Sequence, residues 1–135
     1  MGERRWGSER LLDVSNHNWS FKELKIDKGC KGGLQYHHLK DEAVYVVRGS
    51  LLVRYVDEER TIQSITLHEG ETVRFKPGCI HQEEALTDCL LIEVSTPHMD
   101  DRVRVEEQFG LEAEEGLQST SPTEVGMLTE SIFNV

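Results

Sequence analysis

Two separate stretches of the chain offer four side chains that could bind one metal ion. In an extended segment every second residue lies on the same face, so Gln35 and His37 project together, and Glu42 can join them from the next strand. His81 completes the set from the second stretch. Imidazole nitrogens, a carboxylate and an amide oxygen suit a divalent ion such as Zn, Fe, Mn, Co or Ni. This donor set also leaves coordination positions open for water or a substrate, so it predicts a catalytic metal site.

The first of these stretches resembles the first motif of the cupin family, in which a glycine precedes two ligands one residue apart and a glutamate follows them. Gln35 stands where most cupins have a histidine, and His37 and Glu42 occupy the next two ligand places. Gly49 closes the motif at the expected distance. The resemblance implies that these three side chains contribute to one metal site.

The second stretch resembles the second cupin motif. Gly70, Gly78 and His81 match that motif in register, whereas Lys76 takes the place of its proline and Pro77 is displaced by one residue. Together the two motifs imply an all-β fold, a single double-stranded β-helix or jelly-roll barrel, with the metal in its mouth.

A closer resemblance concerns residues 35–42, which are similar to the Gln-x-His-His-His-Arg-x-Glu run of type II phosphomannose isomerases. The similarity extends over about residues 4–112 and implies a metal-dependent enzyme that interconverts aldose and ketose phosphates. Three positions depart from the pattern: Leu39 replaces the third histidine, Lys40 replaces the arginine, and Val44 replaces an aromatic residue. The metal site tolerates these changes, but the substrate pocket is expected to differ.

Two residues of this run are candidates for catalysis. His38 is the first candidate for proton transfer, because an unperturbed imidazole has a pKa of ~6.5. Lys40 is either a solvated turn residue or the phosphate anchor that replaces the family's arginine. A second ligand register, with Tyr36 and His38 in place of Gln35 and His37, is also allowed in cupins, although phenol ligands are rare.

Two other functions stay open for this sequence. One is a cupin dioxygenase in which the same ligands hold Fe and the open positions bind oxygen. The other is a non-enzymatic, metal-containing cupin that binds a sugar or a small acid, which the loss of the third histidine at Leu39 and the exchange at Lys40 favour. Glu83 and Glu84 follow the last ligand closely and are candidates for a proton shuttle.

Composition limits the range of partners. The chain has 135 residues, 37% of them hydrophobic, which is enough for one domain with one core. A net charge of −10 argues against binding to nucleic acid or to an anionic membrane surface, and leaves a small-molecule substrate. Three cysteines without paired spacing do not suggest a disulfide framework. With neither an apolar signal core nor a run of ~20 apolar residues, the sequence suggests a cytoplasmic protein.

Short runs of alternating apolar residues, separated by turns, predict strands throughout the first part of the chain. Gly49 is expected to supply a positive φ in a tight hairpin between two of them, and Pro77–Gly78 a turn that directs His81 towards the mouth of the barrel. The expected strands are residues 10–14, 19–26, 34–39, 43–47, 50–55, 61–67, 71–75 and 89–94.

The composition changes near residue 116. Residues 1–115 are expected to form the cupin barrel, and residues 116–135 a C-terminal extension with a polar linker followed by apolar residues such as Met127 and Phe133. We expect this extension to pack on the barrel or on a partner subunit, and the protein to be a homodimer.

Overall fold

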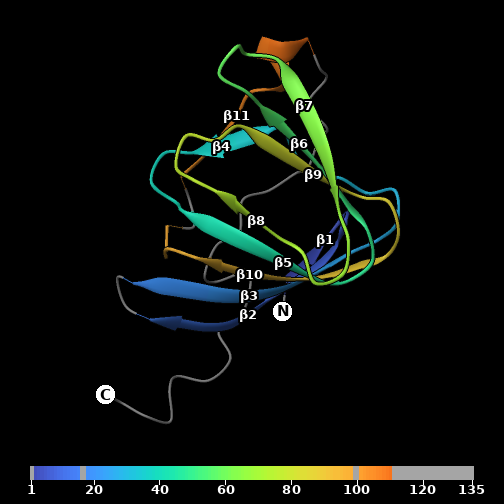
Figure 1. The fold of residues 1–135 in the computed structure, drawn as a ribbon. Helices are drawn as coiled ribbons and strands as arrows, with labels where there is room; N and C mark the ends of the chain where they lie inside the picture. The colour runs from blue at the N-terminus through green and yellow to red at the C-terminus, as the bar shows by residue number, and fades with distance from the viewer. Residues whose placement is uncertain (1, 16–17, 99–100, 111–135) are drawn as a thin grey trace.

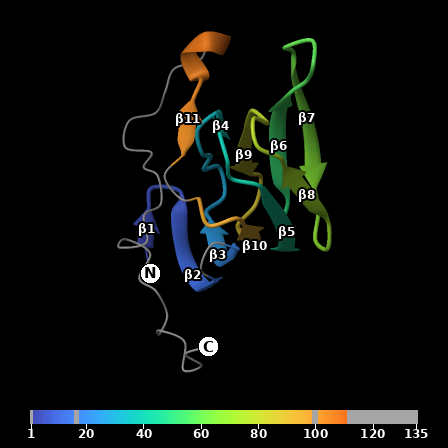
Figure 2. The same cartoon turned by 90° about the vertical axis from the view of Figure 1, so that its left-hand side faces the viewer.

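The protein folds into two antiparallel β-sheets that face one another, as Figures 1 and 2 show. The structure is a computed structural model that describes residues 2–15, 18–98 and 101–110. The expected all-β jelly-roll barrel is therefore confirmed. The expected extension at residues 116–135 lies outside the described residues.

Within the described ranges, the first sheet has six strands and the second has five, with one short 3₁₀ helix after the last strand. In spatial order the first sheet consists of β1 (Gly2–Arg4), β2 (Gly7–Ser15), β3 (Trp19–Ile26), β10 (Cys89–Ser95), β5 (Glu42–Arg48) and β8 (Thr72–Phe75). The second consists of β11 (Arg102–Arg104), β4 (Gln35–His37), β9 (His81–Ala85), β6 (Leu51–Val56) and β7 (Ile62–Leu67), and the helix η1 covers Glu106–Phe109.

The alternation of residues along each strand separates the core from the surface. On β5 the side chains of Val44 and Val46 are fully buried between the sheets, whereas those of Tyr45 and Val47 face outwards. Branched aliphatic residues fit this half-buried, pleated surface well. The core between the sheets consists of Leu24, Ile26, Val44, Val46, Leu51, Val53, Leu67, Phe75, Ala85, Cys89 and Leu91.

All eight expected strands occur, with ends shifted by a few residues, but three further strands were not anticipated. Strand β9 was missed because its inward-facing positions include His81 and Glu83, so it lacks an apolar alternation. Strands β1 and β11 are only three residues long, too short for any periodic pattern.

The turn at Gly49 differs from its expected role. Its φ of 96° is positive, as predicted, and a Cβ atom there would lie only 2.4 Å from the carbonyl oxygen of Asp88. The predicted hairpin is wrong, however, because β5 pairs with β8 and β10 while β6 pairs with β7 and β9. The turn instead carries the chain from one sheet to the other, which allows Glu42 and His81 to approach from opposite layers.

All three cysteines are free thiols. Among the described residues, no helix combines the length and the apolar character that a membrane span requires.

Candidate metal centre

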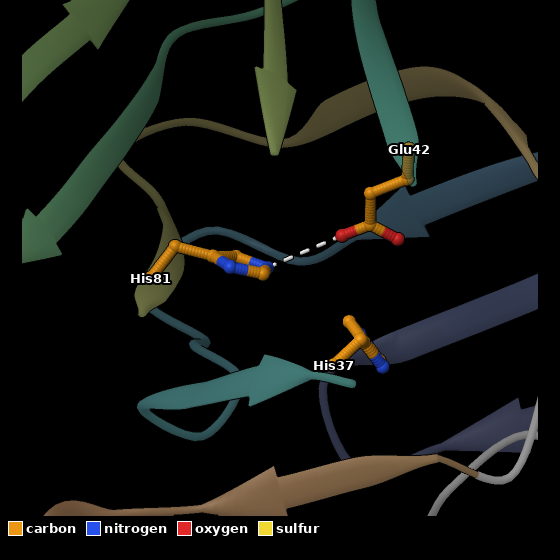
Figure 3. Close-up of side chains that lie close together, drawn as sticks. All are labelled: His37, Glu42 and His81. Carbon is orange, nitrogen blue, oxygen red and sulfur yellow. Dashed lines mark ion pairs between the residues drawn. The ribbon is translucent and has the colours of Figure 1, made fainter. Parts of the chain in front are cut away.

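Three of the four expected ligands converge between the sheets. One nitrogen or oxygen atom from each of His37, Glu42 and His81 can be chosen so that all three atoms lie within 4.8 Å of one another. Figure 3 shows the three side chains pointing towards a common point from β4, β5 and β9. They are 7%, 3% and 2% exposed, respectively, so the cluster is shielded from bulk water.

The ring of His37 is oriented by a carboxylate from a distant part of the chain. Nδ1 of His37 lies 3.0 Å from Oδ1 of Asp101. A carboxylate only accepts hydrogen bonds, so Nδ1 carries the proton and Nε2 keeps its lone pair for a metal. The other oxygen of Asp101 accepts hydrogen bonds from the backbone N–H groups of Leu39 and Lys40, at 2.6 and 2.9 Å. Asp101 therefore fixes both the tautomer of His37 and the turn that leads to Glu42.

The ring of His81 is fixed on two sides. Its Nδ1 donates to the carbonyl oxygen of Cys79 at 3.0 Å, and its Nε2 lies 3.2 Å from Oε1 of Glu42. The ring of Phe75 stacks on it, with centroids 3.8 Å apart and an angle of 7° between the planes. The turn that follows Phe75 includes Gly78, whose φ is 85°, and it positions the Cys79 carbonyl beside Nδ1 of the imidazole. Both histidines thus present Nε2 to the cluster.

Gln35 lies beside the cluster and has an unsatisfied oxygen. It is two residues before His37, on the same face of β4, and it pairs directly with His81 across the β4–β9 ladder. Its Oε1 is buried, and no described residue donates a hydrogen bond to it. A buried carbonyl-type oxygen without a partner is costly, so an additional group is expected to satisfy it.

The donor set therefore fits a divalent metal. His37 and His81 offer imidazole nitrogens, Glu42 offers a carboxylate oxygen, and Gln35 offers an amide oxygen beside them. Mixed nitrogen and oxygen ligands suit Zn, Fe, Mn, Co or Ni.

A row of buried charges extends from this cluster into the first sheet. Nζ of Lys40 lies 2.7 Å from Oε2 of Glu42 and 3.3 Å from Oε2 of Glu93, and Nζ of Lys22 lies 3.7 Å from the same Glu93 oxygen. All four side chains are less than a tenth exposed. The expected phosphate anchor is thus engaged by two carboxylates inside the barrel, which leaves little of its amine free for a ligand.

These contacts shift the pKa values of the cluster in opposite directions. Burial lowers the pKa of His37, with the charge of Lys40 acting in the same sense. Burial also disfavours a charged His81, but its hydrogen bonds to Cys79 and Glu42 raise the pKa of His81 to about 10. Burial works against ionised Glu42 as well, yet Lys40 and His81 hold the pKa of its carboxyl well below the usual value. In the metal-free protein, His81 therefore carries a proton that it donates to Glu42.

Glu83 also lies near the cluster. It is two residues after His81, on the same face of β9. Burial, together with the charge of Glu42, raises the pKa of Glu83 to about 7. The neighbouring Glu84 faces the other side, where its Oε1 accepts a hydrogen bond from Arg54 at 2.9 Å. Of the two candidate shuttles, Glu83 is the one on the ligand face.

The other expected catalytic residue lies away from the ligands. His38 is exposed, and its ring contacts that of Tyr36 edge to face at 5.2 Å. His38 does not belong to the cluster of potential metal ligands that the His, Cys, Asp and Glu side chains form among the described residues. The geometry thus favours the register with Gln35 and His37 over the one with Tyr36 and His38.

Sequence reasoning did not identify the supporting residues Asp101, Glu93 and Lys22. Glu93 and Lys22 lie within strands, where a charged residue ordinarily faces solvent, so neither gave a signal. Asp101 gave no signal in the sequence either. Its proximity to the histidine depends on the pairing of β11 with β4, in which Arg102 lies opposite His37.

The chain belongs to the cupin family. Residues 22–95, more than half of the chain, match the sequence model of the Cupin domain. No curated protein gives a significant match.

Several solved structures share the fold. KdgF from Halomonas sp. has a TM-score of 0.60 and 23% identity, over 69% of this chain and 80% of that one. Oxalate oxidase in complex with the substrate analogue glycolate has a TM-score of 0.63 and 19% identity, over 73% of this chain and 55% of that one. CapF, a capsular polysaccharide assembling protein from Staphylococcus aureus, has a TM-score of 0.66 and 20% identity, over 78% and 32%. At such identities the likeness concerns the fold, and this chain spans about half of oxalate oxidase and a third of CapF.

Proposed function

We propose that this chain is a metal-dependent cupin enzyme that acts on a small, oxygen-rich molecule, and that its reaction is the aldose–ketose isomerisation implied by its resemblance to type II phosphomannose isomerases. The observation that carries the metal part is the convergence of His37, Glu42 and His81 beside the unsatisfied oxygen of Gln35. When bound there, a divalent ion would supply Lewis-acid polarisation of carbonyl and hydroxyl oxygens.

The protein's own residues prepare the site for this chemistry. Asp101 keeps Nε2 of His37 unprotonated, and the Cys79 carbonyl does the same for a neutral His81. Phe75 covers one face of the His81 ring and excludes water from it. The ligands are therefore held in place before a substrate arrives, which reduces the reorganisation needed during reaction.

Isomerisation also needs a group that moves a proton between adjacent carbons. His38 was the first candidate and remains a prediction, although its ring lies at the surface against Tyr36. Glu83 is the second candidate, because its side chain is on the same face of β9 as His81. Comparing Glu83→Gln with His38→Gln in metal-loaded protein separates the two, since only the variant lacking the proton carrier should lose turnover with its metal content intact.

The phosphate part of the proposal depends on Lys40. If Lys40 anchors a phosphate, Lys40→Ala should raise KM by the equivalent of ~1–3 kcal/mol, the range for a lost charge-assisted hydrogen bond, and Lys40→Arg should restore binding. The contacts of its amine with Glu42 and Glu93 favour a second candidate substrate, an unphosphorylated sugar or a small hydroxy acid. Oxalate oxidase with bound glycolate shows that a protein with this fold can hold such an acid.

One experiment ranks the candidates: metal-loaded protein is assayed with hexose and pentose phosphates, the corresponding free sugars, and small hydroxy acids, with His81→Ala as the inactive control. Turnover of a sugar phosphate supports the isomerase. Oxygen consumption by Fe-loaded protein would instead favour the dioxygenase. Binding of one of these compounds without turnover would favour the non-enzymatic cupin. Turnover that survives in His81→Ala would contradict a metal-dependent reaction.

The proposal also includes a cytoplasmic homodimer in which residues 116–135 contact the barrel or the partner. The outer face of the first sheet exposes large apolar side chains, with Tyr45 and Val94 both 47% exposed. Light scattering of the full chain and of Tyr45→Glu tests the dimer. The variant should be monomeric if this face forms the contact.

A further inference from the structure

The two carboxylate oxygens of Glu42 have different partners. Oε1 faces the cluster and lies 3.2 Å from Nε2 of His81, as Figure 3 shows. Oε2 lies on the other side of the carboxylate and is 2.7 Å from Nζ of Lys40. One oxygen is thus directed at the candidate metal position, and the other forms an ion pair with Lys40 although it accepts no hydrogen bond from the described residues.

Lys40 is held firmly in this position. Besides its ion pair with Glu42, its amine donates a hydrogen bond to Oε2 of Glu93 at 3.3 Å, and its backbone N–H donates to Asp101 at 2.9 Å. Only 6% of the residue is exposed, so water screens its charge weakly. Rotation of the amine away from Glu42 would leave both carboxylates without their nearest cation inside the barrel.

The carboxylates of this row already face cationic groups without any metal ion, and Glu42 lies beside His81 as well. Lys22 and Lys40 contribute two positive charges, and Glu42 and Glu93 contribute two negative ones. A divalent ion that binds Glu42 must therefore bind a carboxylate that is already paired with Lys40, and the ammonium group of Lys40 repels the ion at short range.

We propose that Lys40 is a built-in cation that competes with the divalent metal for Glu42, restricting the metal to Oε1 and weakening its binding. The inference rests on the proposed metal site, and it assigns Lys40 a role in setting metal affinity rather than in anchoring phosphate. Lys40 is a positioning residue in this account, because it acts on the metal only through Glu42.

The test compares Co²⁺ binding by the parent, Lys40→Met and Lys22→Met, with no substrate present. Methionine keeps most of the length of the lysine side chain and removes its charge. Lys22 is the matched control, because it is equally buried and contacts Glu93 but has no contact with Glu42 among those described. Lys40→Met should bind Co²⁺ at least about tenfold more tightly, whereas Lys22→Met should stay within about threefold of the parent.

A spectroscopic measurement accompanies the affinities. With Oε2 released, Glu42 can bind through both oxygens, so the visible absorption of bound Co²⁺ should weaken as its coordination number rises. The Lys22→Met spectrum should match that of the parent. Unchanged or weaker affinity in Lys40→Met, or equal tightening in Lys22→Met, overturns the competition.

A second variant keeps the test decisive, and so does a defined interpretation of each combination of results. If Lys40→Met does not fold, Lys40→Met/Glu93→Gln removes one charge of each sign and leaves Glu42 ionised, and the same tightening is expected. If the parent binds no Co²⁺ but Lys40→Met does, the metal-dependent function fails and the competition stands. If the parent binds Co²⁺ and the variant binds no better, the metal site stands and the competition fails. If neither the parent nor Lys40→Met binds Co²⁺, the metal-dependent function and the competition are both overturned.

Discussion

Nδ1 of His37 lies 3.0 Å from Oδ1 of Asp101, a residue 64 positions further along the chain. Both groups are shielded, since the His37 side chain is 8% exposed and that of Asp101 is 16% exposed. The contact joins a candidate metal ligand to the residue immediately before β11, and the same carboxylate holds the backbone of Leu39 and Lys40. The geometry of the ligand strand therefore depends on one aspartate.

Replacement of this aspartate should weaken metal binding without removing a ligand. Asp101→Ala deletes the acceptor for His37 and the two backbone bonds, and the loss of such a partner typically costs 10- to 100-fold, or about 1.4 to 2.7 kcal/mol, in metal affinity. Titration of the metal-free proteins with Zn²⁺ or Co²⁺ measures this loss of metal affinity. Asp57→Ala is the matched control, because Asp57 also accepts two backbone hydrogen bonds but lies in the β6–β7 turn. Equal effects of the two variants would contradict a specific role for Asp101.

The purified protein should carry about one divalent ion per chain when supplied with metal. His37→Ala and His81→Ala should each abolish occupancy, because each removes one of the two imidazole ligands. Elemental analysis measures the content, and the exposed His68 provides the control as His68→Ala. Full metal content in both ligand variants would show that the ion binds elsewhere.

The two ligand registers differ in their response to single substitutions. Gln35→Ala should weaken metal binding or change the preferred ion, since it removes the unsatisfied Oε1 beside the cluster. Tyr36→Phe should leave both properties unchanged, because Tyr36 contacts His38 instead. Titration of both metal-free variants decides between the registers. A large loss of affinity in Tyr36→Phe would transfer the site to Tyr36 and His38.

The stability of the metal-free protein should depend on pH through His81. Although burial acts against it, the hydrogen bonds of His81 raise its pKa from 6.5 to about 10. A group whose pKa is higher in the folded state stabilises the protein below its unfolded pKa, and that contribution is lost as the pH rises through the folded value. Urea unfolding should therefore show a decline in the free energy of unfolding from about pH 6.5 to about pH 10. His81→Gln should lack this part of the decline, and a parent with a flat profile would contradict the assignment.

Metal binding at neutral pH should release about one proton per ion. In the metal-free protein His81 is protonated and pairs with Glu42, and a ligand imidazole must be neutral. Calorimetric titration in buffers with different ionisation enthalpies measures the number of protons released. No proton release would mean that His81 is already neutral before the metal arrives.

Much of the fold could be predicted because the strands of the core alternate strongly. The expected strand at residues 19–26 coincides with β3, and the remaining expectations fall within a few residues of observed strands. The pairing of the strands was harder to predict. The positive φ of Gly49 was predicted correctly, but the strands on either side of it were wrongly expected to pair with each other, because a local turn does not reveal which sheet the next strand joins.

For the site, spacing within two motifs was sufficient to select His37, Glu42 and His81 as a group. The environment of Lys40 could not be predicted in the same way, because its partner Glu93 is 53 residues away in sequence. A lysine in a turn is usually solvated, and only the approach of β10 to β5 encloses this one. Long-range contacts of this kind leave no periodic signal in a single sequence.

The candidate ligands come from both layers of the barrel, with Glu42 in the first sheet and His37 and His81 in the second. A bound ion would therefore link the two layers at an end where the chain segments 38–41 and 76–80 already connect them. Separating the sheets would then require breaking metal–ligand bonds, so buried amides of β5 and β9 should exchange with solvent more slowly, and in step, once metal is bound. The ligand atoms that hold the metal would then also determine how readily this end of the barrel opens.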